Sequence, residues 1–258
     1  MENNSTWTPT QPSPTNWTPE GFRVVPSVFY ALGAVFLTFA ASIAYIVFAV
    51  AAGSINPHKP AEIPPLQQIY AQFAAYAVLL PYLLYFLPRV AGRSLGALGF
   101  RAPGLREIGV GVAGAAVMFL TVSAASALIE SLTHYHDVEP AVALLAQMQS
   151  PYDKLLFVLV AAVLAPIIEE LAFRGFLFNA LSRYLPFAGA ALLSGILFGL
   201  MHASSAHSVL SVSVPLALGG VVLAGVYRYA GCYWSNVITH ALFNSISLVA
   251  VFVFHAKP

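Results

Sequence analysis

The chain has 258 residues, of which 59% are hydrophobic and only 8% are charged, and its formal net charge is +1. An average soluble domain is about 25% charged, so this composition predicts an all-α, polytopic transmembrane protein and argues against a soluble enzyme. The sequence has no basic cluster of the kind that nucleic-acid binding needs, so nucleic acid is not expected as a partner. The single cysteine, Cys232, excludes an internal disulfide and a Cys-x-x-Cys metal pair.

Three regions follow one another along the chain. Residues 1–25 are polar and rich in Pro, Thr and Asn, which is typical of a disordered or surface-lying tail. Residues 26–153 are expected to form N-terminal transmembrane helices, and residues 154–258 a helical core. Apolar runs long enough to cross about 30 Å of hydrocarbon predict a bundle of about seven spans. These runs are residues 27–53, 66–88, 108–132, 154–180, 187–204, 208–228 and 233–254.

Positive charge indicates the orientation of this bundle. The connector between the second and third runs carries four arginines, the densest positive charge in the chain. The positive-inside rule places this connector, and with it the amino terminus, in the cytoplasm. The Ala-rich helices and the unusual tail favour a prokaryotic plasma membrane, in which we expect an integral, multi-pass protein.

The fourth run contains the only acidic residues of the C-terminal region, the adjacent Glu169 and Glu170, followed by Arg174. A charge within hydrocarbon costs roughly 2.5–3.5 kcal/mol on insertion scales, so it persists only where it is paired or functional. Glu170 and Arg174 are four residues apart and share one helix face, whereas Glu169 lies about 100° round the helix. We therefore expect Arg174 to neutralise Glu170 and leave Glu169 as the candidate for chemistry.

Three further polar residues lie in apolar runs: His202 in the fifth, and His240 and Asn244 on one face of the seventh. Polar side chains within spans usually face the bundle interior, so we predict a site between the fourth, fifth and seventh helices. One free carboxylate, two imidazoles and a carboxamide form a set that can hydrolyse a peptide bond. A carboxylate with a His partner takes a proton from water, while a second His and an Asn donate hydrogen bonds to the oxyanion.

Other interpretations of these residues stay open at this point. The Glu-Glu/Arg arrangement can be a structural ion pair or part of a proton path, and a His in a membrane helix can simply bond a neighbouring helix. Other intramembrane hydrolases are disfavoured, because the chain has no His-Glu-x-x-His motif and residues 154–258 contain no Asp. Ser194 lies in Leu-Leu-Ser-Gly, which differs from the Gly-x-Ser-Gly of a rhomboid-like serine protease.

Taken together, three motifs resemble the CPBP intramembrane protease family, also called the Abi family, which includes type II CAAX prenyl endopeptidases and bacteriocin-processing or self-immunity proteins. The family pattern is Glu-Glu-x-x-x-Arg, Phe-x-x-x-His and His-x-x-x-Asn/Asp, within about residues 150–254. This chain matches the pattern without departure, at Glu169 to Arg174, Phe198 to His202 and His240 to Asn244.

The resemblance implies a glutamic endopeptidase in which Glu169 and His202 activate water and His240 and Asn244 stabilise the oxyanion. Glu170 and Arg174 would be the supporting pair, and Phe198 would pack beside the site. The implied substrate is a membrane-anchored or lipidated peptide within the lipid bilayer.

No cofactor is expected, because an Asn as fourth member of the set suits a hydrogen-bond donor better than a metal ligand. A divalent ion held by the carboxylate and the two His is the alternative. The alternative functions are a non-catalytic membrane scaffold, a bacteriocin-immunity-type protein and a proton-coupled carrier.

Overall fold

The computed structural model describes residues 21–59, 63–134, 140–205 and 207–254. The described residues form helices joined by turns and short connections, and they include no strand, which confirms the predicted all-α, polytopic bundle. The predicted tail, residues 1–25, lies almost entirely outside the described residues.

Ten α-helices follow one another in the described chain. Their bounds are α1 Val24–Ala51, α2 Pro65–Ala91, α3 Leu105–Thr133, α4 Pro140–Ala146, α5 Pro151–Leu159, α6 Ala165–Glu170, α7 Asn179–Ser182, α8 Phe187–Leu200, α9 Val214–Ala230 and α10 Tyr233–Phe254. Three π-helical stretches and one 3-10 turn join them: η3 Val160–Leu164, η4 Leu171–Phe178, η5 Val209–Ser213 and η2 Gly96–Leu98.

Five helical segments of the described chain are long and apolar enough to cross a membrane: Val24–Ala51, Pro65–Ala91, Leu105–Thr133, Pro151–Ser182 and Val209–Ala230. The fourth segment is continuous because α5, α6 and α7 are joined by η3 and η4. The other two predicted spans correspond to α8, a shorter apolar helix, and to α10. The short α4 lies in the connection that the sequence predicts between the third and fourth spans.

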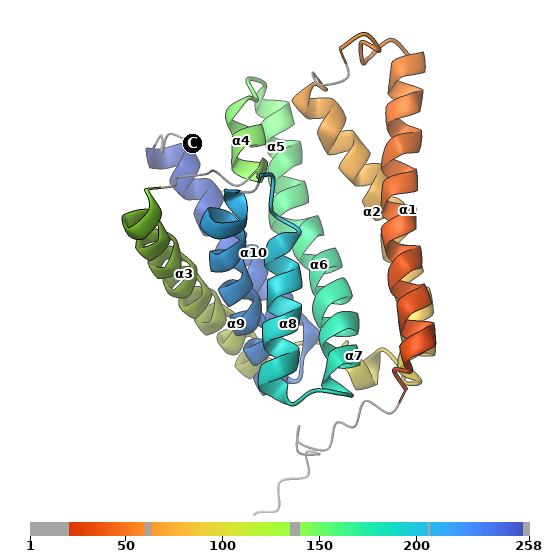
Figure 1. The fold of residues 1–258 in the computed structure, drawn as a ribbon, viewed down its shortest axis with the longest axis vertical. Helices are drawn as coiled ribbons and strands as arrows, with labels where there is room; N and C mark the ends of the chain where they lie inside the picture. The colour runs from red at the N-terminus through yellow and green to blue at the C-terminus, as the bar shows by residue number, and fades with distance from the viewer. Residues whose placement is uncertain (1–20, 60–62, 135–139, 206, 255–258) are drawn as a thin grey trace, which may run out of the picture.

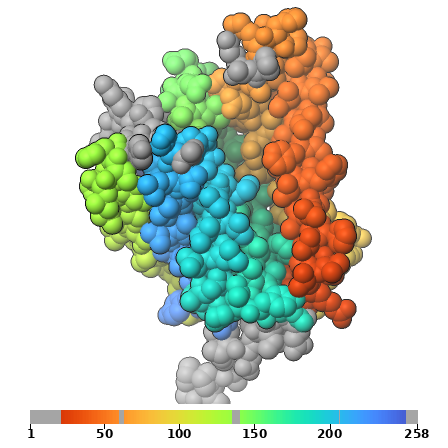
Figure 2. Space-filling model, viewed as in Figure 1, coloured from red at the N-terminus to blue at the C-terminus, as the bar shows by residue number. Residues whose placement is uncertain are grey.

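Figure 1 shows α1 and α2 as a hairpin at one side of the molecule and α3 at the opposite side, with the remaining long helices between them. The most apolar part of α1 is only 6% buried, whereas that of Val209–Ala230 is 50% buried. The α1 helix is therefore peripheral, packs chiefly on α2 and faces lipid, and α9 is central. Figure 2 shows that the viewed face is hollowed between α1 and α8.

Local sequence signals set the ends of these helices. Gly92 caps the C-terminal end of α2 and Gly231 caps that of α9, with φ angles of 63° and 58° in the left-handed region that favours glycine. At the start of α3, Glu107 Oε2 accepts the backbone N–H of Gly104 at 3.0 Å, as in a capping box. The side chain of Arg101 donates to the other oxygen of this carboxylate at 2.9 Å.

The α2–α3 connection is bonded to the turn between α9 and α10. The Tyr227 hydroxyl donates to the carbonyl of Leu98 at 2.7 Å, and the Tyr233 backbone N–H donates to the carbonyl of Gly99 at 2.9 Å. This docking fixes where α10 begins, and with it the height of His240 in the bundle.

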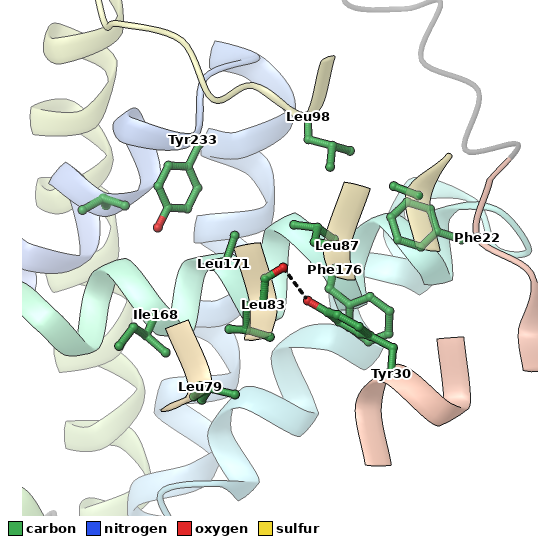
Figure 3. Close-up of a cluster of buried hydrophobic side chains, with 12 residues drawn as sticks. Phe22, Tyr30, Leu79, Leu83, Leu87, Leu98, Ile168, Leu171, Phe176 and Tyr233 are labelled. Atoms are coloured by element: carbon green, nitrogen blue, oxygen red, sulfur yellow. Dashed lines mark hydrogen bonds between the residues drawn. The ribbon is translucent and has the colours of Figure 1, made fainter. Parts of the chain in front are cut away.

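A buried cluster holds the helix of the two glutamates against α2. Leu79, Leu83 and Leu87 of α2 share one buried cluster with Ile168 and Leu171, which flank the glutamates on either side. Figure 3 shows these side chains together with Tyr30 of α1, whose hydroxyl donates to the carbonyl of Leu83 at 3.3 Å. Within a membrane such packing stabilises through van der Waals contact rather than through the hydrophobic effect.

Glycines allow α8 and α9 to approach closely. A Cβ on Gly220 would lie 2.7 Å from the Cα of Gly195, and a Cβ on Gly199 would lie 2.1 Å from the carbonyl oxygen of Ser213. Small residues at helix contacts are typical of membrane bundles. The close contact brings the carbonyl of Gly220 within reach of Arg174.

Candidate active site

The helix that carries the two glutamates is widened on both sides of them. Glu169 and Glu170 end α6, a six-residue α-helical piece between the π-helical stretches η3 and η4. Such π-helical insertions occur frequently at functional sites, because they change the direction in which neighbouring side chains point. Here the two adjacent carboxylates point into separate environments.

Glu170 is fully buried, and its carboxylate accepts hydrogen bonds from three side chains. Oε1 accepts from Arg174 Nη1 at 3.0 Å and from His240 Nδ1 at 2.9 Å. Oε2 accepts from Asn236 Nδ2 at 2.8 Å. Both carboxylate oxygens are thus hydrogen-bonded to side chains within the bundle, as a buried charge requires.

Arg174, also fully buried, joins three helices. Besides its ion pair with Glu170, it donates from Nη2 to the carbonyl of Gly220 on α9 at 2.8 Å. Its guanidinium carbon lies 4.9 Å from the ring centroid of Phe198 on α8, within the range of a cation–π contact. The pairing at four-residue spacing is the one that the sequence predicts.

Glu169 has a different environment from its neighbour. Its side chain is 25% exposed, whereas that of Glu170 is 0% exposed. Glu169 Oε2 lies 3.9 Å from His240 Nε2, too far for a direct hydrogen bond. An oxygen atom of a water molecule or of a peptide, placed beside these two atoms, could hydrogen-bond to both Glu169 and His240.

His240 lies between the two carboxylates and is almost fully buried. A carboxylate only accepts hydrogen bonds, so the contact with Glu170 assigns a proton to His240 Nδ1. The second nitrogen, Nε2, is then the one directed at Glu169. Glu170 therefore orients this imidazole in addition to neutralising Arg174, a role that the sequence does not reveal.

His202 and His240 share one aromatic wall, the ring of Phe198. The ring centroids lie 4.9 Å apart for Phe198 and His202, and 5.6 Å apart for Phe198 and His240. His202 Nδ1 donates to the backbone carbonyl of Phe198 at 2.8 Å, because a carbonyl can only accept. Its Nε2 is then the nitrogen available for chemistry.

Asn244 lies one helical turn beyond His240 and is partly buried. Its Nδ2 donates to the carbonyl of Ala161 in η3 at 2.8 Å. One of the two amide protons thus supports the π-helical stretch below the glutamates. An oxyanion would have to use the other proton, so the structure adds a supporting role to the one that the sequence predicts.

One residue bonded to the glutamates is absent from the sequence-based set. Asn236 donates directly to Glu170. The signal for Asn236 was available, because Asn236, His240 and Asn244 are spaced by four residues and so lie on one helix face.

The described residues include no group of three or more His, Cys, Asp or Glu side chains arranged to hold a metal ion. The Nδ1 atoms of both His are engaged as donors, which leaves only the Nε2 atoms as possible ligands.

Comparison with known proteins locates a related family in the C-terminal region. Residues 151–246 match the family described as type II CAAX prenyl endopeptidase Rce1-like. A Bacillus subtilis (strain 168) protein named "Putative membrane peptidase YdiL" is 29% identical over 94 residues, which is 36% of this chain and 36% of that relative. The matched part thus spans about a third of the relative's length, and no solved structure matches the chain.

The family match includes all three motifs. In the structure His202, just beyond the end of α8, and His240 both lie beside Phe198, and Glu169 lies 3.9 Å from His240. The comparisons confirm the resemblance predicted from these motifs: over residues 151–246, this chain is similar to the CPBP family of membrane proteases.

Proposed function

We propose that this chain is an integral-membrane endopeptidase that uses Glu169 to activate water against a peptide bond. One observation carries the proposal: two adjacent glutamates occupy separate environments. Glu170 is fully buried and bonded to three donors, whereas Glu169 is 25% exposed and faces an imidazole nitrogen at 3.9 Å. A carboxylate that is not required for the ion pair, and that lies beside a histidine, is suited to general-base catalysis.

In the proposed reaction Glu169 accepts a proton from water, with the Nε2 of His202 holding that water. The water oxygen forms a bond to the peptide carbonyl carbon, and the carbonyl oxygen becomes an oxyanion. The carbon–nitrogen bond then breaks as Glu169 passes its proton to the departing amine. One water is consumed, and its oxygen remains in the new carboxylate. General-base assistance of this kind typically contributes about 10²–10⁴-fold to a rate.

The oxyanion needs hydrogen-bond donors, which His240 Nε2 and the second amide proton of Asn244 would supply. His240 can donate from Nε2 only as an imidazolium, because its Nδ1 already carries a proton toward Glu170. Charge balance supports this form: Glu169, Glu170, Arg174 and a protonated His240 sum to zero. A neutral group of charges is the arrangement that a membrane interior favours.

The proposed substrate is a membrane-anchored or lipidated peptide, because the charged cluster lies among apolar spans and a water-soluble chain would not reach it readily. The matched family is named for prenyl endopeptidases, and the curated relative is named a membrane peptidase. For this chain we infer the wider class, a peptide held at the membrane, with cleavage at the depth of Glu169.

The proposal is tested by comparing membrane peptides from cells that express the wild type or the Glu169→Gln variant. Mass spectrometry of new peptide termini should find cuts that appear with the wild type and vanish with Glu169→Gln. A matched control is Glu130→Gln at the end of α3, which replaces an exposed glutamate outside the cluster and should keep the cuts. Both variants must be extracted in folded form at wild-type levels.

An identical set of termini for wild type and Glu169→Gln would contradict the proposal. If the biological activity of the chain also persists in that variant, the function is that of a non-catalytic membrane scaffold or an immunity-type protein.

A further inference from the structure

Asn236 lies in the first turns of α10 and is completely buried. Its amide nitrogen makes two hydrogen bonds, to Glu170 Oε2 at 2.8 Å and to the carbonyl of Leu223 on α9 at 2.9 Å. Both amide protons are therefore used, and they join α10 to the glutamate helix and to α9. Its Oδ1, also buried, has no described partner.

Asn236 donates to Glu170 Oε2, the carboxylate oxygen to which no other described side chain is hydrogen-bonded. Arg174 and His240 both bond Oε1 of Glu170, whereas Asn236 alone bonds Oε2. A carboxylate can rotate about its last carbon–carbon bond, which has a broad, roughly two-fold energy profile. The bond to Oε2 removes this freedom, and Oε1 stays directed at Nδ1 of His240.

We propose that Asn236 is a positioning residue for hydrolysis: by holding Glu170 Oε2, it keeps Glu170 Oε1 on His240 Nδ1 and directs His240 Nε2 to the space beside Glu169. The role in catalysis rests on the proposed function, but the positioning itself does not. In metal sites, removing the partner that orients a ligating histidine costs about 10–100-fold in activity, and we expect a loss of similar size here.

The chain contains a matched control for this asparagine. Asn179 at the start of α7 is also buried, also uses its amide nitrogen for two bonds, to the Gly175 carbonyl and the Tyr227 hydroxyl, and also has an Oδ1 without a described partner. It contacts none of Glu169, Glu170 or His240 through these bonds. Comparing substitutions at Asn179 and Asn236 therefore separates the effect of losing a buried amide from the effect of losing the orientation of His240.

The kinetic experiment measures kcat and KM on a synthetic peptide that spans a cut found with the wild type, using detergent-purified Asn236→Ala and Asn179→Ala. We expect both variants to lose thermal stability. Only Asn236→Ala should also lower kcat, by about 10–100-fold with little change in KM. Equal kcat values for the two variants would overturn the proposal.

The Asn236→Asp variant adds a readout that a packing role would not change. A protonated carboxyl can donate one hydrogen bond to Glu170, whereas an ionised carboxylate cannot and repels it. Among the described residues, Asn236 bonds the Glu170 carboxylate, which also bonds Arg174 and His240, and Glu169 lies 3.9 Å from His240. We expect kcat of Asn236→Asp to be greatest at low pH and to fall as the new carboxyl ionises with rising pH, relative to wild type and Asn179→Asp. Parallel profiles for all three proteins would contradict positioning.

A spectroscopic measurement does not depend on protease activity. In protein labelled with ¹⁵N-histidine, His240 is assigned by its absence in His240→Gln. The wild type should show a protonated, hydrogen-bonded Nδ1, and Asn236→Ala should alter this signal while Asn179→Ala leaves it unchanged. If Asn236→Ala changes the His240 signal but the wild-type protein cleaves no peptide, the positioning role stands and the proposed protease function is refuted. An unchanged His240 signal in Asn236→Ala would refute the positioning.

Discussion

Replacing Arg174 by Met removes the cation from the buried cluster while it keeps most of the side-chain volume. Arg174 and Glu170 are both 0% exposed and lie 3.0 Å apart, so no solvent can take the place of the guanidinium. Removing one partner of such a pair destabilises a protein by about 3–5 kcal/mol, because the other charge stays buried and unpaired.

Three further hydrogen bonds of the cluster adjust this estimate, one raising the expected loss and two lowering it. The variant also loses the hydrogen bond to the Gly220 carbonyl, and bonds from a charged donor contribute about 1.5–3 kcal/mol. Glu170 keeps its bonds from Asn236 and His240, which reduce the penalty on its charge. We therefore expect a loss within about 3–5 kcal/mol, which corresponds to more than 100-fold in the ratio of folded to unfolded protein.

Thermal unfolding in detergent, followed by size-exclusion fluorescence, measures this loss. Glu170→Gln combined with Arg174→Met removes both charges, so the double variant should be more stable than Arg174→Met alone. A wild-type melting temperature for Arg174→Met, or a double variant no more stable than the single one, would refute the assignment of Arg174 and Glu170 as a buried, interdependent pair.

Three other outcomes follow from the same structure. Gly199→Ala should lower thermal stability by about 1–3 kcal/mol or more, because its Cβ would lie 2.1 Å from the Ser213 carbonyl oxygen, whereas Gly225→Ala has nothing within 4 Å and should leave stability unchanged or raised. Asn244→Ala should lower turnover by about 10²–10³-fold as the loss of an oxyanion donor, and a loss of stability with turnover intact would assign it to the Ala161 contact alone. Peptide hydrolysis should persist in the presence of strong chelators, and loss of activity with recovery on zinc addition would show that a metal takes part.

The sequence predicts the parts of the fold that depend on local chemistry. Long apolar runs determine the spans, because a backbone in hydrocarbon must satisfy its own hydrogen bonds as a helix. The spacing of Glu170 and Arg174 predicts their ion pair, because residues four apart share a helix face. The end of α8 is less predictable. The sequence predicts a span over residues 187–204, whereas the 14-residue α8 ends at Leu200, and Met201 and His202 lie just beyond it.

The contacts between helices depend on how each helix is rotated about its own axis, which composition does not determine. The bond between Glu170 and His240 joins residues 70 positions apart, and the bond between Glu170 and Asn236 joins residues 66 positions apart. The sequence assigns Glu170 to Arg174 alone, yet the structure adds two donors. Likewise, Asn244 bonds the carbonyl of Ala161 in the π-helical stretch η3, and no residue pattern in η3 predicts that geometry.

The most direct test compares Glu169→Gln with Glu170→Gln, measuring thermal stability and peptide hydrolysis on the same purified samples. The two substitutions are chemically identical and adjacent, so only their environments differ. We predict that Glu169→Gln melts near the wild-type temperature and cleaves nothing, whereas Glu170→Gln melts at a clearly lower temperature. Retained cleavage in a folded Glu169→Gln protein would contradict the role of this carboxylate as the base that activates water.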